Sequence, residues 1–164
     1  MTDAGQPGCN ASFAKTDVTA APERAAQIRR EFSDWLRGHF TLDPTKASDV
    51  LLAVNEALAN AAEFAYVTAK RPGVMHVRAD YNGDAAVLTV TVTDEGAWRN
   101  TDSQTQENRR GRGIPLIHAL TDRATFDSTP TGTEVCLQWD RIFQISTALP
   151  AESTPAQNCG SRTT

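Results

Sequence analysis

The chain has no excess of basic residues and no long apolar run. Its 16 Lys and Arg are outnumbered by 20 Asp and Glu, which gives a formal net charge of -4. Proteins that coat phosphate backbones need a basic excess, so direct nucleic-acid binding is not expected. No stretch approaches the run of about 18 apolar residues that a membrane span needs, and the first residues lack the pattern of a secretion signal. We therefore expect no membrane insertion and a cytoplasmic location.

Cysteine is also scarce, and the three cysteines cannot all pair with one another. Cys9 and Cys159 lie in polar terminal segments, whereas Cys136 lies within an apolar run. We interpret all of them as thiols in a reducing compartment.

Two common nucleotide-binding patterns are missing as well. The sequence contains no Gly-x-x-x-x-Gly-Lys-Ser/Thr of a P-loop. Its stretch RRGRGIPLI does not follow a strand, as the glycine fingerprint of a dinucleotide-binding fold would. Both folds are therefore excluded.

What the chain does contain suits one globular domain. Of its 164 residues, 40% are hydrophobic and 22% are charged, values typical of a soluble domain. Residues 1–11 and 143–164 are poor in large apolar groups and are predicted to be flexible ends. The domain is accordingly placed at residues 12–142.

Helices are predicted where apolar residues recur at three- and four-residue spacing. The first runs from Pro22 to about Phe40, and Asp43-Pro44 supplies a cap and a first-turn proline for a second. The second ends near Arg71-Pro72-Gly73. Its predicted buried face consists of Leu51, Val54, Leu58, Ala61, Ala62 and Ala65.

Strands are predicted where β-branched residues alternate with others. A short strand is expected at residues 12–18, a hairpin at 74–94 that turns at Asn82-Gly83-Asp84, and a closing hairpin at 123–140. A short helix, GIPLIHALTD, lies between the hairpins. This order predicts an α+β fold, a two-layer sandwich with helices on one face of a mixed, mostly antiparallel sheet.

Two segments place acidic and amide groups where a core does not need them. Glu56 and Asn60 are four residues apart and project from one side of the second helix, although a solvated helix face would look the same. Asp94 and Gly96 end a strand. A carboxylate there can accept a hydrogen bond from an exocyclic amine, and a glycine lets a flat ring approach, although such a pair is more often a simple turn.

Two further segments combine glycines with helix or strand starts. Gly111 and Gly113 precede the short helix, whose free amides can bind phosphate, although a flexible linker would look similar. Gly132-Thr133 leads into the last strand, where the hydroxyl can bond a base or a water molecule, and alone is an ordinary turn.

In order, the segments NEALANAAEFAY, TDEGAWR, GRGIPLI and GTEV resemble the N box and the three glycine-containing boxes of the GHKL ATPases, which share the Bergerat nucleotide fold. Within that group, the chain is most similar to the stand-alone anti-sigma-factor serine kinases of partner-switching systems. The resemblance implies ATP and Mg²⁺ as cofactors. It also implies Glu56 as the general base and Asn60 as the Mg²⁺ ligand.

The same resemblance assigns the remaining site residues. Asp94 would accept a hydrogen bond from the adenine amino group, Gly96 would leave room for the base, and Thr133 would complete adenine recognition. The segment between Trp98 and Gly111 would be the ATP lid, and its Arg109 and Arg110 could supply charge near the γ-phosphate. The phosphate-bounding residues would be Gly111, Arg112, Gly113 and Ile114.

The implied partners are an RNA polymerase sigma factor, a STAS-domain antagonist that would receive the phosphate on serine, and a second copy of the chain. Two residues depart from the family pattern: Phe64 stands where a histidine is common, and Pro115 stands in the first turn of the short helix. An alternative is therefore a nucleotide-gated binding module without kinase activity. A plain interaction domain that needs no nucleotide is a third interpretation.

Overall fold

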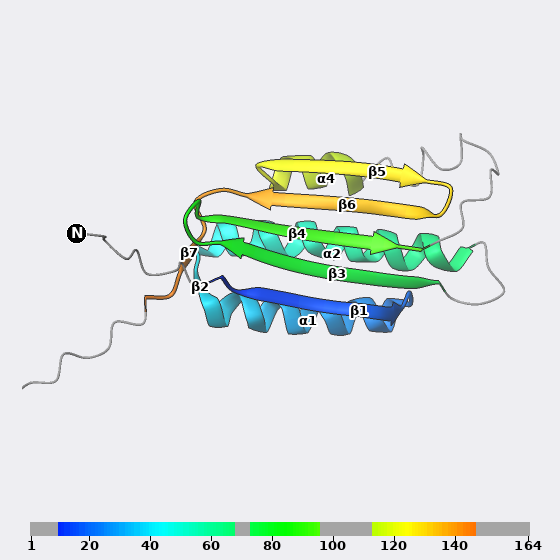
Figure 1. Cartoon of the computed structure of the whole chain (residues 1–164), viewed down its shortest axis with the longest axis horizontal. Coiled ribbons are helices and arrows are strands. Elements are labelled where there is room, and N and C mark those ends of the chain that lie inside the picture. Colours follow the sequence, from blue (N-terminus) through cyan, green and yellow to red (C-terminus); the bar gives the residue numbers. More distant parts are fainter. Residues whose placement is uncertain (1–9, 68–72, 96–112, 147–164) are drawn as a thin grey trace, which may run out of the picture.

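The computed structural model describes residues 10–67, 73–95 and 113–146, without the side chains of 64–67. Helices and one sheet form two layers, with the helices gathered on one face of the sheet (Figure 1). The elements are β1 (Ser12–Thr19), α1 (Pro22–His39), β2 (Phe40–Thr41), α2 (Pro44–Val67), β3 (Val74–Asn82), β4 (Val87–Asp94), α4 (Gly113–Leu120), β5 (Arg123–Thr129), β6 (Gly132–Trp139) and β7 (Phe143–Gln144). The predicted α+β sandwich is confirmed.

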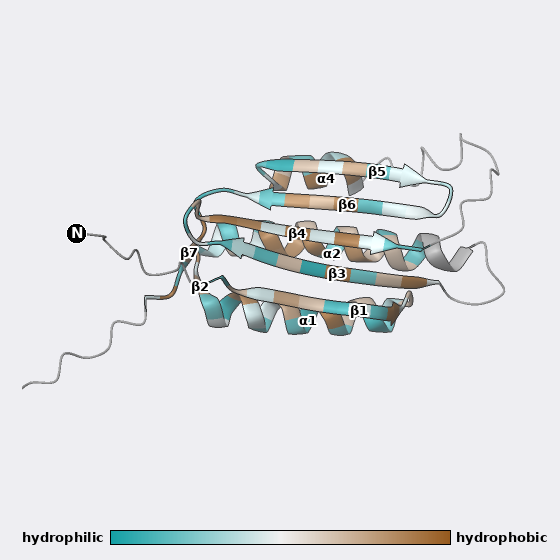
Figure 2. Ribbon diagram, viewed as in Figure 1, coloured by the Kyte–Doolittle hydropathy of each residue, from teal (hydrophilic) through white to brown (hydrophobic). Residues whose placement is uncertain are grey.

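The main sheet has five strands in the order β1-β3-β4-β6-β5. Every pairing within it is antiparallel, so no parallel pair makes the sheet mixed in the described part of the chain. Hydrophobic and hydrophilic residues alternate along β3 and β4 (Figure 2). This alternation turns one face of the sheet toward the helices and leaves the other open.

A second, two-stranded sheet was not expected from the sequence. In it β2 pairs with β7, with Phe40 opposite Gln144 and Thr41 opposite Phe143. Phe40, which we assigned to the first helix, lies in β2 instead. The strand β7 lies beyond residue 142, where the sequence analysis placed the end of the domain. Strands of two residues carry no periodicity, and for that reason the sequence did not reveal them.

Both long helices begin where their capping residues indicate. Pro22 opens α1 at its first position, where its missing N–H removes no helical hydrogen bond. At the start of α2, the Lys46 amide donates to Asp43 Oδ1 at 2.9 Å, so Asp43 caps the helix as predicted.

The buried face of α2 differs in part from the prediction. Leu51 is only half-buried: it packs against the core and also lines a groove between α1 and α2. The side chain of Ala65 lies outside the described part. Contact with α1, α4 and the sheet gives α2 a wide buried stripe, whose position a single helix sequence does not determine. The buried residues of α2 are Val50, Ala53, Val54, Ala57, Leu58, Ala61 and Ala62.

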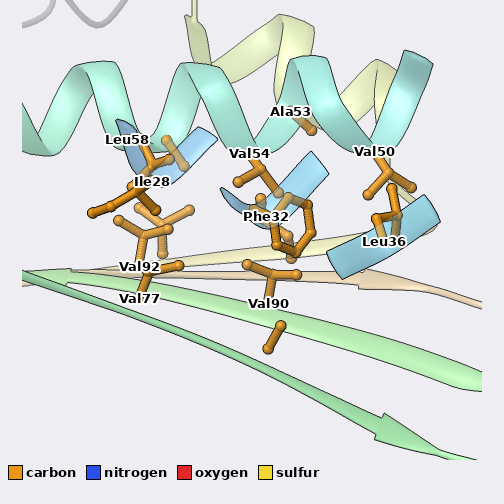
Figure 3. Close-up of a cluster of buried hydrophobic side chains, with 14 of the residues drawn as sticks. Ile28, Phe32, Leu36, Val50, Ala53, Val54, Leu58, Val77, Val90 and Val92 are labelled. Carbon is orange, nitrogen blue, oxygen red and sulfur yellow. The ribbon is translucent and has the colours of Figure 1, made fainter. Parts of the chain in front are cut away.

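The core lies between the helices and the sheet. Figure 3 shows Ile28, Phe32 and Leu36 of α1 and Val54 and Leu58 of α2 above Val77, Val90 and Val92 of the sheet. Phe32 is fully buried, at 0% exposure. Burying a side chain of this kind contributes about 1.5–3 kcal/mol relative to leaving it in water.

The turn between β3 and β4 is formed by four residues, Gly83 to Ala86. Asn82 Oδ1 accepts hydrogen bonds from the amides of Asp84 and Ala85, both at 3.1 Å. The left-handed residue of the turn is Ala86, with φ of 54°, and not the glycine. The predicted hairpin is thus confirmed, while its turn is wider than the Asn-Gly pair indicates.

We find no described helix that combines the length and the apolar composition needed to cross a membrane.

Candidate functional site

Asp94 ends β4 with its side chain on the helix-covered face. It is 6% exposed and is the only charged or polar residue classed as buried in the described part of the chain. Its Oδ1 accepts a hydrogen bond from the Thr133 amide at 3.3 Å. Because a buried carboxylate is costly unless its oxygens have partners, its retention here points to a role beyond packing.

Gly132 allows β6 to approach β4 at this point. A Cβ atom at Gly132 would lie 2.0 Å from the Asp94 carbonyl oxygen and 3.1 Å from the Asp94 carbonyl carbon. No side chain larger than hydrogen fits such a contact without a shift of the backbone. Glycine is needed here for space and not for conformation, since its φ is not positive.

A row of polar side chains crosses three strands at this end of the sheet. Asp94 of β4 is opposite Thr133 of β6, and Thr133 is opposite Ser128 of β5. The Ser128 and Thr133 hydroxyl oxygens are 3.5 Å apart. Sequence analysis singled out Asp94 and Thr133 but missed Ser128, because its position in the row depends on the register between β5 and β6.

Asn60 of α2 lies near this row, and Glu56 is one helical turn before it. Both are half-buried, so neither side chain is fully exposed to solvent. A Cβ on Gly113, the first residue of α4, would lie 3.2 Å from Asn60 Nδ2 and 3.6 Å from Glu56 Oε2. The start of α4 therefore lies directly against the two α2 side chains. The missing side chain of Gly113 permits this close approach.

A cavity lies between α2, the start of α4 and the polar row. It is mainly apolar, with polar groups from Asn60, Asp94, Ser128 and Thr133. Phe126 on β5 is a second lining residue that sequence analysis missed. The residues that line the cavity are Ala57, Asn60, Ala61, Val92, Asp94, Ile114, Phe126, Ser128, Thr133 and Val135. Apolar walls with a few convergent polar groups are typical of small-molecule sites.

Several of the proposed site residues fall outside the described residues. These are Gly96, Gly111 and Arg112, together with the predicted lid that contains Arg109 and Arg110. The side chain of Phe64 also lies outside the described part. Of the predicted site, the structure brings Asn60, Asp94, Ile114 and Thr133 to one cavity. Gly113 and Glu56 lie beside Asn60 without lining that cavity.

The comparison with known families agrees with this geometry. The family model for the histidine kinase-like ATPase domain matches residues 18–139, which include α1, α2, β3, β4, α4, β5 and β6. The chain belongs to this family. The GHKL resemblance stated from the sequence motifs is thereby confirmed, and ATP is the ligand class that the family name itself gives.

A solved structure has the same fold. It contains the RsbU and RsbW domains of Rv1364c from Mycobacterium tuberculosis, and the match has a TM-score of 0.60 at 23% identity. The match covers 83% of this chain and 33% of the other, so this chain corresponds to about a third of that protein's length. At this identity the likeness establishes the shared fold.

Proposed function

We propose that this chain is an ATP-binding anti-sigma factor that phosphorylates serine on a STAS-domain antagonist. The observation that supports it most is the row formed by Asp94, Thr133 and Ser128, which closes one end of an apolar cavity. A purine base suits a site that combines apolar walls with a few hydrogen-bonding groups. In the proposal, the adenine amino group donates to Asp94, and Thr133 completes the contact.

Phosphate binding is proposed at the start of α4. Amides at a helix N-terminus attract anions, and Gly113 and Ile114 lie there beside Asn60. Gly111 and Arg112 precede this helix in the chain and would extend the same contact. In the same proposal Gly96 leaves room for the base beside Asp94.

Magnesium would be held by the Asn60 amide oxygen. Mg²⁺ prefers oxygen ligands, takes few of them from protein and completes its shell with phosphate and water. Asn60 lines the cavity, and both atoms of its amide lie near the start of α4, with Nδ2 at 3.2 Å and Oδ1 at 3.6 Å from the Cβ position of Gly113. The amide oxygen of Asn60 is a ligand type that suits Mg²⁺, and the bound ion would neutralise charge on the phosphates.

Glu56 is the proposed general base. Its carboxylate lies one helical turn from Asn60 on α2, so it would face the end of a bound triphosphate while Asp94 holds the base. There it would accept the proton of the attacking serine hydroxyl as the phosphoryl group is transferred. Three parts of the proposal rest on the motif resemblance alone: the sigma-factor partner, the specificity for serine and the homodimer.

Phosphotransfer to a purified STAS-domain antagonist tests the kinase proposal. With labelled ATP and Mg²⁺, we expect label on serine for the wild type and a loss of about 10²-fold or more for Glu56→Gln. Glu63→Gln is the matched control, since Glu63 lies on the same helix and is exposed. Equal transfer by Glu56→Gln and the wild type would contradict the role of Glu56.

The alternative is a nucleotide-gated binding module, which the replacement of the family histidine by Phe64 favours. In that case ATP binds and changes partner affinity, but no label reaches any STAS protein. Binding of ATP without transfer, together with an ATP-dependent affinity for a sigma factor, would support this alternative over the kinase.

A further inference from the structure

His76 lies on β3, on the open face of the sheet and opposite the nucleotide cavity. Its side chain is 25% exposed, and both of its ring nitrogens have hydrogen-bond partners. Nδ1 accepts from the Asp17 amide at 3.1 Å, and Nε2 lies 3.0 Å from Glu95 Oε1. The proposed function uses neither His76 nor Glu95.

The partners determine the tautomer of the ring. Because the Asp17 amide can only donate, Nδ1 carries no hydrogen. The neutral ring therefore carries its hydrogen on Nε2, which donates to the Glu95 carboxylate. His76 thus joins two segments through one side chain, and each nitrogen serves one of them.

One of these segments is an irregular part of β1. The register of β1 against β3 shifts between Lys15 and Val18, and Asp17 in this bulge has a left-handed φ of 54°. Asp tolerates this conformation better than most residues. The bulge turns the Asp17 amide toward His76, whose position in β3 follows Met75, the partner of Val18.

The other segment is the end of β4, at the base-binding row. Glu95 directly follows Asp94, and its amide donates to the Val74 carbonyl oxygen at 2.9 Å. His76 pairs with Thr93, the residue before Asp94. The contact with Glu95 therefore ties the backbone on one side of Asp94, while the backbone of Gly132 approaches the Asp94 carbonyl closely on the other.

We propose that His76 is a positioning residue that fixes the Asp94 carboxylate for adenine through its hydrogen bond to Glu95. This inference rests on the proposed ATP site. A carboxylate that reads a base must be held within a fraction of an ångström, and such precision comes from supporting contacts behind the binding group. The hydrogen bond from the Asp17 amide fixes the imidazole ring of His76. The hydrogen bond from the ring to Glu95 then fixes the backbone next to Asp94.

Two conservative substitutions separate the two bonds. The amide of Gln reaches the position of Nε2, so His76→Gln keeps a donor for Glu95. The amide of Asn reaches the position of Nδ1, so His76→Asn keeps an acceptor for Asp17 and loses Glu95. Arg78→Gln is the matched control, since Arg78 lies on the same strand and face and pairs with Asp80.

The experiment measures dissociation constants of the full chain for ATP and GTP with Mg²⁺, and the free energy of unfolding without nucleotide. We expect His76→Gln and Arg78→Gln to bind ATP within about twofold of the wild type, and His76→Asn to bind it about five- to tenfold more weakly, the effect of one lost hydrogen bond. Affinity for GTP should change little, so the preference for ATP falls. Glu95→Ala should match His76→Asn, and the double variant should lose no more than either.

Equal ATP affinity in His76→Asn and His76→Gln would overturn the inference, as would a parallel loss for ATP and GTP, which indicates general loosening. If the wild type binds no nucleotide, the proposed function fails and takes this inference with it. If the wild type prefers ATP and His76→Asn keeps that preference, the inference alone fails.

Discussion

The paired strands β4 and β6 present different side chains to the helices at their two ends. At one end Leu88 of β4 lies opposite Trp139 of β6, and both are 0% exposed. At the other end the opposing residues are Asp94 and Thr133, beside a cavity. The helix changes in parallel: α2 contributes Val50 to the core, while Ala57 and Ala61 line the cavity. Small side chains and polar groups at this end leave a cavity in a layer that is otherwise packed.

The filled end is also tied together by hydrogen bonds. The Tyr81 hydroxyl donates to the Ile142 carbonyl oxygen at 2.7 Å, and Trp139 Nε1 donates to the Leu120 carbonyl oxygen at 2.8 Å. Burial raises the pKa of the Tyr81 hydroxyl, so it stays a donor at neutral pH. Both of these hydrogen bonds lie at the filled end, away from the cavity.

The largest effect is expected from Gly132→Ala at the cavity end. The added Cβ would meet the Asp94 carbonyl oxygen at 2.0 Å, so β6 must move away from β4. We expect a loss of about 2–4 kcal/mol in the free energy of unfolding, measured by denaturant titration, and a loss of ATP binding.

Gly38→Ala is the control for that substitution. Gly38 lies in α1, and a Cβ there would meet nothing within 4 Å. Alanine should stabilise the helix by up to about 1 kcal/mol. Equal stability changes in the two variants would show that the close approach of β6 to Asp94 is not a constraint.

Tyr81→Phe probes the filled end with a smaller effect. The ring stays buried, but the Ile142 carbonyl oxygen loses its donor. We expect the free energy of unfolding to fall by about 1 kcal/mol, with ATP affinity unchanged. A clear loss of ATP affinity in this variant would mean that the two ends are coupled.

Asp122→Asn gives the smallest effect, and it depends on pH. The Asp140 amide donates to Asp122 Oδ2 at 2.8 Å, and this bond, aided by Lys46, holds the pKa of the Asp122 carboxyl below its usual range. A lowered folded-state pKa contributes stability above the unfolded-state pKa, and that stability is lost as pH falls through the folded value.

The wild type should therefore lose more stability than Asp122→Asn between about pH 6 and pH 3. The difference should be at most about 1 kcal/mol, because the side chain is 39% exposed and solvent screens its interactions. Unfolding titrations of both proteins at the two pH values measure it. Parallel pH profiles would refute this role of Asp122.

Local patterns predicted much of the fold. Two alternating runs between Val74 and Asp94 identified the hairpin, and Asp43-Pro44 located the start of α2, because both signals depend on neighbouring residues only. The four boxes led to the candidate site residues through their family resemblance, and the structure places Asp94 opposite Thr133. Features that depend on neighbouring residues could therefore be predicted from the sequence.

Features that depend on distant partners escaped prediction. Ser128 joins the polar row through strand register, and His76 acquires its role through a bulge that is 59 residues away in the chain. Leu51 is less buried than its place on the apolar face indicated, because the contacts of α2 with α1 and α4 could not be known. The pairing of β2 with β7 joins two short segments that have no pattern of their own.

The most direct test of the account is the melting temperature with Mg²⁺ and ATP, ADP or GTP, for the wild type and Asp94→Asn. Asp84→Asn is the matched control, since Asp84 is an exposed carboxylate in the β3–β4 turn. ATP at a hundred times its Kd should stabilise the wild type by about 2.7 kcal/mol, a shift of roughly 5 to 10 °C. We predict this shift for ATP over GTP, its retention in Asp84→Asn and its loss in Asp94→Asn. An equal ATP shift in Asp94→Asn, or none in the folded wild type at millimolar nucleotide, would contradict the assignment of the polar row as an adenine site.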